Sequence, residues 1–177
     1  MAIPVIIRLV EEIFRVVVQF LHVFSGLMWL GGGFYTIFVQ TPALLAAPPG
    51  ARGPVLGQII PRQVNYLLRL GEATIALGVL NLFASGKARL LENVFGSRWA
   101  IAILVGAILG VTLLAIGHAI LKPSALRLLE LGPRAGGGDS SAAAEMGAII
   151  ARLRTVGFAQ IALGLAIVGA MVVARFS

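Results

Sequence analysis

The chain contains no cysteine, and only 12% of its 177 residues are charged. Without thiols it can form no disulfide, no thiolate metal site and no iron–sulfur cluster. The scarcity of charge is accompanied by 59% hydrophobic residues and a mean hydropathy of +0.98. A soluble core of this size does not need so much apolar surface, so the composition indicates an integral membrane protein in contact with the lipid bilayer.

Acidic residues are also few, since 7 Asp and Glu face 14 Lys and Arg for a net charge of +7. In a soluble protein such a charge suggests a nucleic-acid partner, but this chain has no basic patch interleaved with aromatic residues. Arginines that flank membrane spans and are attracted to anionic head groups explain the charge better. We therefore expect no nucleic-acid partner.

Four apolar stretches are long enough to cross a hydrocarbon layer of roughly 30 Å, which takes about 20 helical residues. They are Val16 to Leu44, Tyr66 to Ser85, Trp99 to Leu121 and Thr155 to Ala174. None alternates with period two, and lipid requires every backbone polar group to be bonded internally, so helices are predicted rather than barrel strands. The sequence predicts an all-α fold, a single four-helix transmembrane bundle over residues 1–177 in up-down-up-down order.

Two segments outside these spans are also predicted to be helical. The charged residues between Arg8 and Arg15 belong to an amphipathic lead-in that we expect to lie along the membrane interface and then turn into the first span. The apolar run that follows is too long for a cleaved signal peptide. Between the third and fourth spans, an amphipathic piece at Ser124 to Leu131 precedes a glycine run. Asp139 or Ser140 is placed to cap a long fourth helix that starts outside the membrane.

His22 lies in the long apolar run that forms the first span. An ionisable or metal-binding side chain inside a bilayer is costly and usually has a function. The alternative is a core histidine that is hydrogen-bonded to a neighbouring helix. A helical step of 3.6 residues places it on a stripe that we expect to face protein rather than lipid. The stripe comprises His22, Gly26, Trp29, Gly33, Thr36 and Gln40.

A second group of polar residues is expected at one level of the bundle, near the far end of the first span. Its members are Tyr35, Gln40, Arg69, Glu72, His118 and Gln160. Arg69 and Glu72 are three residues apart on one helix and can form an ion pair, which lessens the cost of immersing both. The group either holds helices together or forms a polar pocket for propionates, a quinone head group, protons or an ion.

His22 and His118 are the only histidines, which raises the question of a shared haem. Counted from the ends of their spans, they fall in opposite halves of the bilayer, roughly 20 Å apart at a rise of 1.5 Å per residue. We therefore expect each to serve its own site, with His118 either a ligand or a residue that faces head groups. Few other candidate ligands share the level of His22: Met171, Met28, Asn81 and Ser85. His/Met ligation is known for haem, although a methionine is also a common filler between helices.

The first span carries a motif with family resemblance. His22-x6-Trp29-x-Gly31-Gly32 resembles the first-helix motif of a superfamily that includes the copper-resistance D proteins, the bacterial membrane protoporphyrinogen oxidase and the N-terminal membrane domain of bacterial urate oxidase. The string at 29–44, WLGGGFYTIFVQTPAL, looks most like the urate-oxidase membrane domain. Weaker matches are Arg69-x-Gly71 in the second span and Pro123 just after the third.

The resemblance implies binding of haem b through the histidine of the first helix. It makes His22 the axial ligand and Trp29 a wall of the pocket, with Gly26 and Gly33 on the same stripe. The chain lacks the additional histidines of many relatives and a soluble cytochrome c domain. The resemblance therefore does not extend to oxidation of urate or of protoporphyrinogen.

Three functional hypotheses follow. The first is a b-type haem protein of a bacterial inner membrane, acting in electron transfer or as a haem-bearing redox subunit. It would work with a membrane redox partner or as a homo-oligomer, and Arg69 would pair with a propionate or another charge. The second is a copper or small-ion permease, in which His22, Met28 and Met171 form a path of soft ligands. The third is a structural membrane subunit without a cofactor, in which the polar residues only fix the register of the helices.

Overall fold

The computed structural model describes residues 2–177, apart from the side chains of residues 2–4 and 49–52. All regular elements in this part of the chain are helical, and four long helical stretches are apolar enough to cross a membrane. The predicted all-α four-helix membrane bundle is confirmed. The elements are α1 (Ala2–Tyr35), η1 (Thr36–Gln40), α2 (Thr41–Ala46), α3 (Pro49–Ala84), η2 (Lys87–Gly96), α4 (Arg98–Ile116), η3 (Gly117–Leu121), α5 (Lys122–Gly136) and α6 (Ser140–Arg175).

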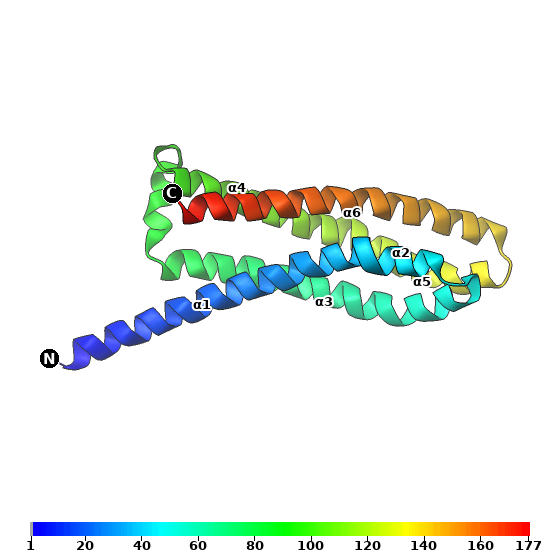
Figure 1. Cartoon of the computed structure of the whole chain (residues 1–177), viewed down its shortest axis with the longest axis horizontal. Coiled ribbons are helices and arrows are strands. Elements are labelled where there is room, and N and C mark those ends of the chain that lie inside the picture. Colours follow the sequence, from blue (N-terminus) through cyan, green and yellow to red (C-terminus); the bar gives the residue numbers. More distant parts are fainter. Residues whose placement is uncertain (1) are drawn as a thin grey trace.

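The four stretches run up, down, up and down (Figure 1). Both termini and η2 lie at one end of the bundle, and the α2–α3 and α5–α6 connections lie at the other. The most extensive packing between long helices joins α1 to α3 and α4 to α6. The bundle is therefore built from two helix pairs, and the first pair carries His22.

The helices are longer than a bilayer is thick. With 36 residues, α6 extends about 54 Å at 1.5 Å per residue, whereas the hydrocarbon core measures about 30 Å. Within the four stretches, segments with little or no charge lie side by side. We call this part the membrane layer, and it comprises residues 16–40, 63–86, 99–121 and 155–174. Arg69 and Glu72 are its only Lys, Arg, Asp or Glu residues.

The N-terminal lead-in is helical, as expected, but it does not turn into the first span. α1 runs from Ala2 to Tyr35 as one α-helix and projects past the end of the bundle (Figure 1). The sequence between residues 5 and 25 contains neither glycine nor proline, so nothing in it breaks the helix.

Two π-helical turns, η1 and η3, interrupt the long stretches, and each ends two residues before a proline, Pro42 or Pro123. Proline cannot donate an N–H to the carbonyl four residues earlier, and its ring crowds that carbonyl. A widened π turn relieves the crowding, so the helix continues past the proline. The third span therefore does not end at Leu121 as predicted, because η3 leads directly into α5.

The end of the bundle beyond η3 forms a cap that resembles a water-soluble protein. We define the cap as α5 with the first turns of α3 and α6. Ile60 of α3 and Ala125 and Leu128 of α5 form its buried core. They are surrounded by partly buried apolar residues: Leu56, Val64, Leu129, Met146, Ile149, Ile150 and Leu153. The amphipathic piece predicted at 124–131 is thus the central helix of this cap.

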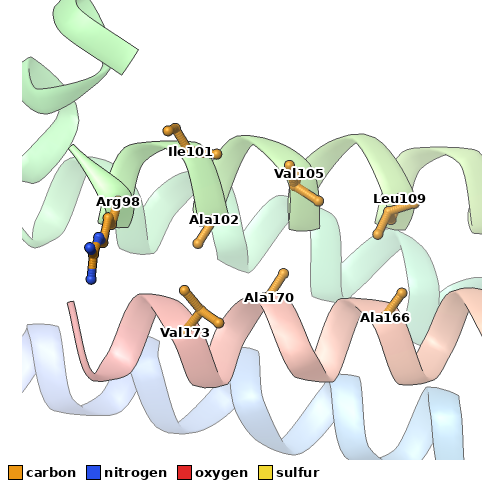
Figure 2. Close-up of a pocket in the computed structure, with 8 residues that line it drawn as sticks. All are labelled: Arg98, Ile101, Ala102, Val105, Leu109, Ala166, Ala170 and Val173. Carbon is orange, nitrogen blue, oxygen red and sulfur yellow. The ribbon is translucent and has the colours of Figure 1, made fainter. Parts of the chain in front are cut away.

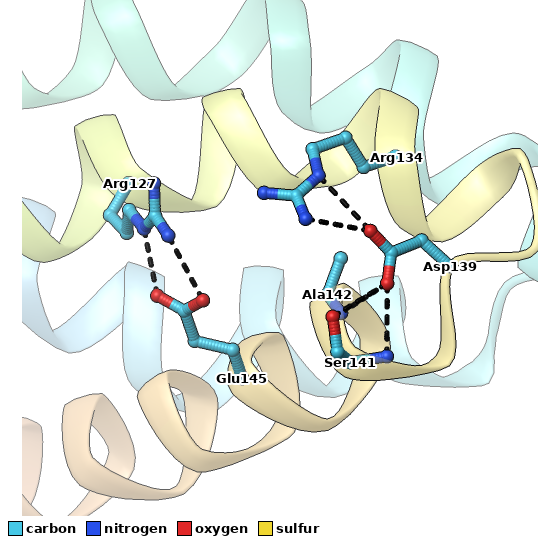
Figure 3. A network of polar contacts seen from close by, with 6 residues as sticks. All are labelled: Arg127, Arg134, Asp139, Ser141, Ala142 and Glu145. Atoms are coloured by element: carbon cyan, nitrogen blue, oxygen red, sulfur yellow. Dashed lines mark hydrogen bonds and ion pairs between the residues drawn. The ribbon is translucent and has the colours of Figure 1, made fainter.

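Ion pairs fasten α5 to the start of α6 on the surface of the cap (Figure 3). Arg127 contacts Glu145 at 2.7 Å, and Arg134 contacts Asp139 at 2.7 Å. Asp139 also caps α6, since its side chain accepts hydrogen bonds from the backbone N–H groups of Ser141 and Ala142. The prediction that Asp139 or Ser140 caps the start of the fourth helix is confirmed, and the capping residue is Asp139.

These contacts change the acidity of the groups involved. The Ser141 hydroxyl, the Ala142 N–H and the Arg134 guanidinium together hold the pKa of Asp139 well below its ordinary value. Arg127 lowers the pKa of Glu145 through its hydrogen bonds. Each shift favours the ionised form, so both contacts are strongest above the ordinary pKa of a carboxyl group.

Candidate functional site

The stripe predicted on the first helix faces α3 along most of its length. A side-chain carbon added at Gly26 would lie 3.5 Å from Thr74 on α3, and the ring of Trp29 covers Gly71 on the same helix. Gly33 is the exception, because a carbon added there meets nothing within 4 Å. Its neighbour Gly32 makes the close approach instead, against Leu67. We call this contact between α1 and α3 the seam.

His22 is held in the seam by its Nδ1 atom. Nδ1 lies 2.9 Å from the backbone carbonyl oxygen of Thr74. Because a carbonyl can only accept, the neutral ring carries its proton on Nδ1 and its lone pair on Nε2. The ring also rests on Gly78, where an added side-chain carbon would lie 2.9 Å from Cε1 of the ring. Only glycine leaves room for the imidazole at this position.

Two hydroxyl groups support this arrangement. Ser25 is buried, and its hydroxyl donates to the backbone carbonyl of His22 at 3.0 Å. The Thr74 hydroxyl lies 3.1 Å from that of Ser25 and donates to the carbonyl of Leu70 at 2.7 Å. The backbone groups on both sides of the imidazole are therefore fixed by local hydrogen bonds.

The second nitrogen of His22, Nε2, is not tied to another described group of the subunit. No hydrogen bond reaches Nε2 from the side chains that the structure describes. Among those side chains, no buried nitrogen or oxygen lacks a partner. It follows that Nε2 reaches the surface of the subunit. An imidazole with one nitrogen tied to a carbonyl and the other exposed has the orientation that metal-ligating histidines adopt.

Trp29 lies further along the seam. Its ring and Leu114 of α4 both approach Gly71 of α3, since a side-chain carbon added at Gly71 would lie 2.7 Å from the indole and 2.9 Å from Leu114. Gly71 is seven residues from Gly78, which corresponds to about 10 Å along α3. Trp29 therefore lies where α1, α3 and α4 approach one another, and it is offset along α3 from the contact of His22 with Gly78.

A second cluster gathers around Glu72, the only acidic residue in the membrane layer. Its carboxylate contacts Arg69 at 3.0 Å and Nε2 of His118 at 3.2 Å. The pairing of Arg69 with Glu72 was expected, as was the common level of Glu72 and His118. The side chains are open to the outside of the subunit, with exposed fractions of 83% for Arg69, 37% for Glu72 and 42% for His118.

The two histidines have different partners, and the prediction that each serves its own site stays a prediction. His22 contacts Gly78 and His118 contacts Glu72, and these two residues of α3 are six positions apart, which is about 9 Å along the helix. This offset between the contacted residues is smaller than the separation of roughly 20 Å predicted for the rings from the ends of the spans. The rings nevertheless occupy separate helix pairs, α1 with α3 and η3 with α3.

Gln63 was missed by the sequence analysis and completes the seam. It exchanges two hydrogen bonds with Gln40, of 2.9 and 2.8 Å, and donates to the Thr36 hydroxyl at 2.6 Å. Both partners lie on the π turn η1. The second span was predicted to begin only at Tyr66, whereas α3 begins at Pro49, so Gln63 lay outside the predicted span.

The other residues that the sequence suggested for a site have different surroundings. Asn81 donates to Gln19 at 2.6 Å rather than contacting His22, and the Ser85 hydroxyl donates within its own turn to Leu82. The methyl group of Met171 lies against Gly106 of α4. Tyr35 and Met28 are exposed, and Gln160 is partly buried. The part of the chain that the structure describes holds no group of three or more His, Cys, Asp or Glu residues able to bind a metal ion.

A groove between α4 and α6 has a volume of about 350 Å³ and is almost entirely apolar (Figure 2). Its walls are Ile101, Val105 and Leu109 of α4 and Ala166, Ala170 and Val173 of α6, with Arg98 at one end. Figure 2 shows Leu109 of α4 pointing toward α6, and Ala166 and Ala170 of α6 pointing toward α4. The groove carries no hydrogen-bonding group within the layer, so it matches lipid chains and not a site of chemistry.

The chain was compared with models of protein families, with characterised proteins and with solved structures. None of them matches.

The geometry of the seam fits one axial ligand of a haem but not an enclosed pocket. His22 offers a fixed tautomer and an outward Nε2, as an iron ligand requires. The cavities of about 350 and 440 Å³ in this fold are lined by other residues. The residues that line these cavities would therefore not enclose a porphyrin held by His22.

Proposed function

We propose that this chain is an integral-membrane b-type haem protein of a bacterial inner membrane, acting in electron transfer or as a haem-bearing redox subunit. The iron ligand is Nε2 of His22. One observation carries the proposal: within the membrane layer, the Thr74 carbonyl holds the proton on Nδ1 and leaves Nε2 open at the surface. A costly polar group in lipid is thereby oriented for coordination rather than satisfied on both sides.

The residues around the ligand have distinct parts in this proposal. The Thr74 carbonyl sets the tautomer and the orientation of the ring, as outer-shell partners of ligating histidines do. Gly78 admits the ring between the helices, and Ser25 fixes the backbone that carries it. A bound haem would supply one-electron chemistry, and His22 would hold it in position. Arg69, Glu72 and His118 form a separate polar cluster.

The test is the absorbance spectrum of the full-length protein purified in detergent, reduced minus oxidised. We expect a Soret band and α/β bands that are lost in His22→Ala and retained in His118→Ala. Circular dichroism and a single elution peak show that the variants remain folded. Gly78→Leu, which removes the space for the imidazole, should abolish the bands as well.

An unchanged spectrum in His22→Ala contradicts the proposal. A colourless wild-type protein also contradicts it and separates the alternatives. Stoichiometric copper after dialysis would then favour the permease, and a colourless protein without metal would favour a structural subunit.

A further inference from the structure

A cavity of about 440 Å³ lies between the projecting part of α1 and the end of α3. Four charged side chains of α1 line it, and we call them the charged stripe: Arg8, Glu11, Glu12 and Arg15. The other walls are Phe14 and residues 84–86, which are the last residue of α3 and the two that follow it. This cavity is distinct from the seam and from the Glu72 cluster.

The charged stripe continues the face of α1 that packs against α3. Arg8, Arg15 and His22 are spaced by seven residues and so share one side of the helix. At this end of the bundle the seam ends at the hydrogen bond of 2.6 Å between Asn81 and Gln19, and α3 itself ends at Ala84. Beyond this point, α1 presents charged groups where α3 no longer covers it.

The four charges have no ion-pair partner in the described part of the subunit. None of them takes part in an ion pair within 4 Å, although Arg8 and Glu12, and Glu11 and Arg15, are spaced for pairing along one helix. The stripe holds two positive and two negative groups, so its net charge is zero. A ligand that complements it carries both signs.

The position of the cavity further restricts which class of ligand can bind there. Arg15 marks the edge of the membrane layer, at the end of the bundle that also carries Lys87, Arg98 and Arg175. Phospholipid head groups occupy this depth. Phe14, whose residue is 49% exposed, offers an apolar surface beside the charges.

We propose that the cavity binds the head group of a zwitterionic phospholipid with a primary amine. The phosphate pairs with Arg8 and Arg15, and the ammonium donates hydrogen bonds to Glu11 and Glu12. The end of α3 adds to the attraction for the ammonium, because a helix carries partial negative charge at its C-terminus and α3 has no basic residue in its last turn. Charge-assisted hydrogen bonds of this kind are stronger than hydrogen bonds between neutral groups. The amine should therefore make binding specific for lipids whose head group can donate such bonds.

The experiment is native mass spectrometry of the full-length protein with phosphatidylethanolamine, phosphatidylcholine or phosphatidylglycerol added at equal concentration. We expect phosphatidylethanolamine to bind about tenfold better than phosphatidylcholine, whose quaternary ammonium cannot donate a hydrogen bond. Glu11→Gln with Glu12→Gln should abolish this preference, and Arg8→Gln with Arg15→Gln should weaken binding of all three lipids. The matched control is Arg152→Gln with Glu130→Gln, at the opposite end of the bundle, which should change nothing.

Equal binding of phosphatidylethanolamine and phosphatidylcholine by the wild type overturns the proposal, as does preferential binding of phosphatidylglycerol, which would indicate a site for anions alone. Loss of the preference in the control variant overturns it too. The single variants Glu11→Gln and Glu12→Gln, checked by circular dichroism, provide the same readout if the double variant does not fold. The result does not depend on haem.

Discussion

The cap and the membrane layer are parts of the same helices, yet they are held together differently. In the cap, α5 buries Ala125, Leu128 and Leu131, and ion pairs lie on the outside. In the layer, the buried residues of α4 are almost all small: Ala100, Ala102, Gly106, Gly110 and Leu113. Large apolar side chains in the layer, such as Phe20 and Leu165, point outward.

The difference follows from the solvent. Water drives leucines of the cap into a core, because burial of apolar surface is favourable there. Lipid gives no such drive, so helices in the layer associate through close approach at small residues and through hydrogen bonds. The seam uses both means, with glycines under His22 and Trp29 and amides between η1 and α3.

The largest effect should come from the core of the cap. Leu131 is fully buried, with an exposed fraction of 0%, and Leu131→Ala should cost about 2–5 kcal/mol of the free energy of unfolding. Hydrogen exchange of α5 should report the loss. Leu126→Ala, at a residue that is 47% exposed, is the control and should have little effect. Equal costs would mean that the cap does not have a water-driven core.

The second-largest effect should come from the close approach of α1 and α3 at Gly71. Gly71→Ala places a methyl group 2.7 Å from the indole of Trp29, so we expect a loss of about 1–3 kcal/mol. The control, Gly33→Ala, meets nothing within 4 Å and should be neutral or stabilising, since alanine favours a helix more than glycine does. Unfolding in mixed detergent micelles measures both. A similar loss at both positions would contradict the role of Gly71.

A smaller effect is expected from the amide contacts. Gln63→Leu removes the hydrogen bonds to Gln40 and Thr36, and interhelical hydrogen bonds in membranes contribute about 0.6–2 kcal/mol. Gln160→Leu is the matched control, because no side-chain hydrogen bond is described for Gln160. The same unfolding assay should separate the two variants; if they behave alike, the amides do not stabilise the seam.

The smallest effect concerns the surface of the cap. Because the pKa of Asp139 is lowered in the folded protein, its contribution to stability is complete above the ordinary carboxyl pKa and is lost as the pH falls below about 4. The protection of the first turn of α6 against hydrogen exchange, measured relative to the intrinsic exchange rate at each pH, should therefore fall in acid. In Asp139→Asn this pH dependence should be much weaker, whereas Glu92→Gln in η2 should retain it. An unchanged profile in Asp139→Asn would contradict the assignment.

Much of the fold could be predicted because its signals are local. Apolar length predicted the four spans, and the side chain of Asp139 predicted the start of α6. The continuation through Pro123 could not be predicted, since it depends on whether a π turn relieves the proline. Part of the site was predicted in the same way: helical period placed His22 and Trp29 on the face toward another helix, and spacing paired Arg69 with Glu72.

By itself, the sequence determined that the chain is a helical membrane protein and which residues share a stripe with His22 on the first helix, because hydropathy and period are properties of single segments. Only the tertiary structure decided that Thr74 binds Nδ1 of His22, that Gln63 meets Gln40, and that Gly32 rather than Gly33 makes the close approach. These outcomes depend on the rotation and register between helices. A rotation of about 100°, the angle between adjacent helical residues, changes which residue meets its neighbour.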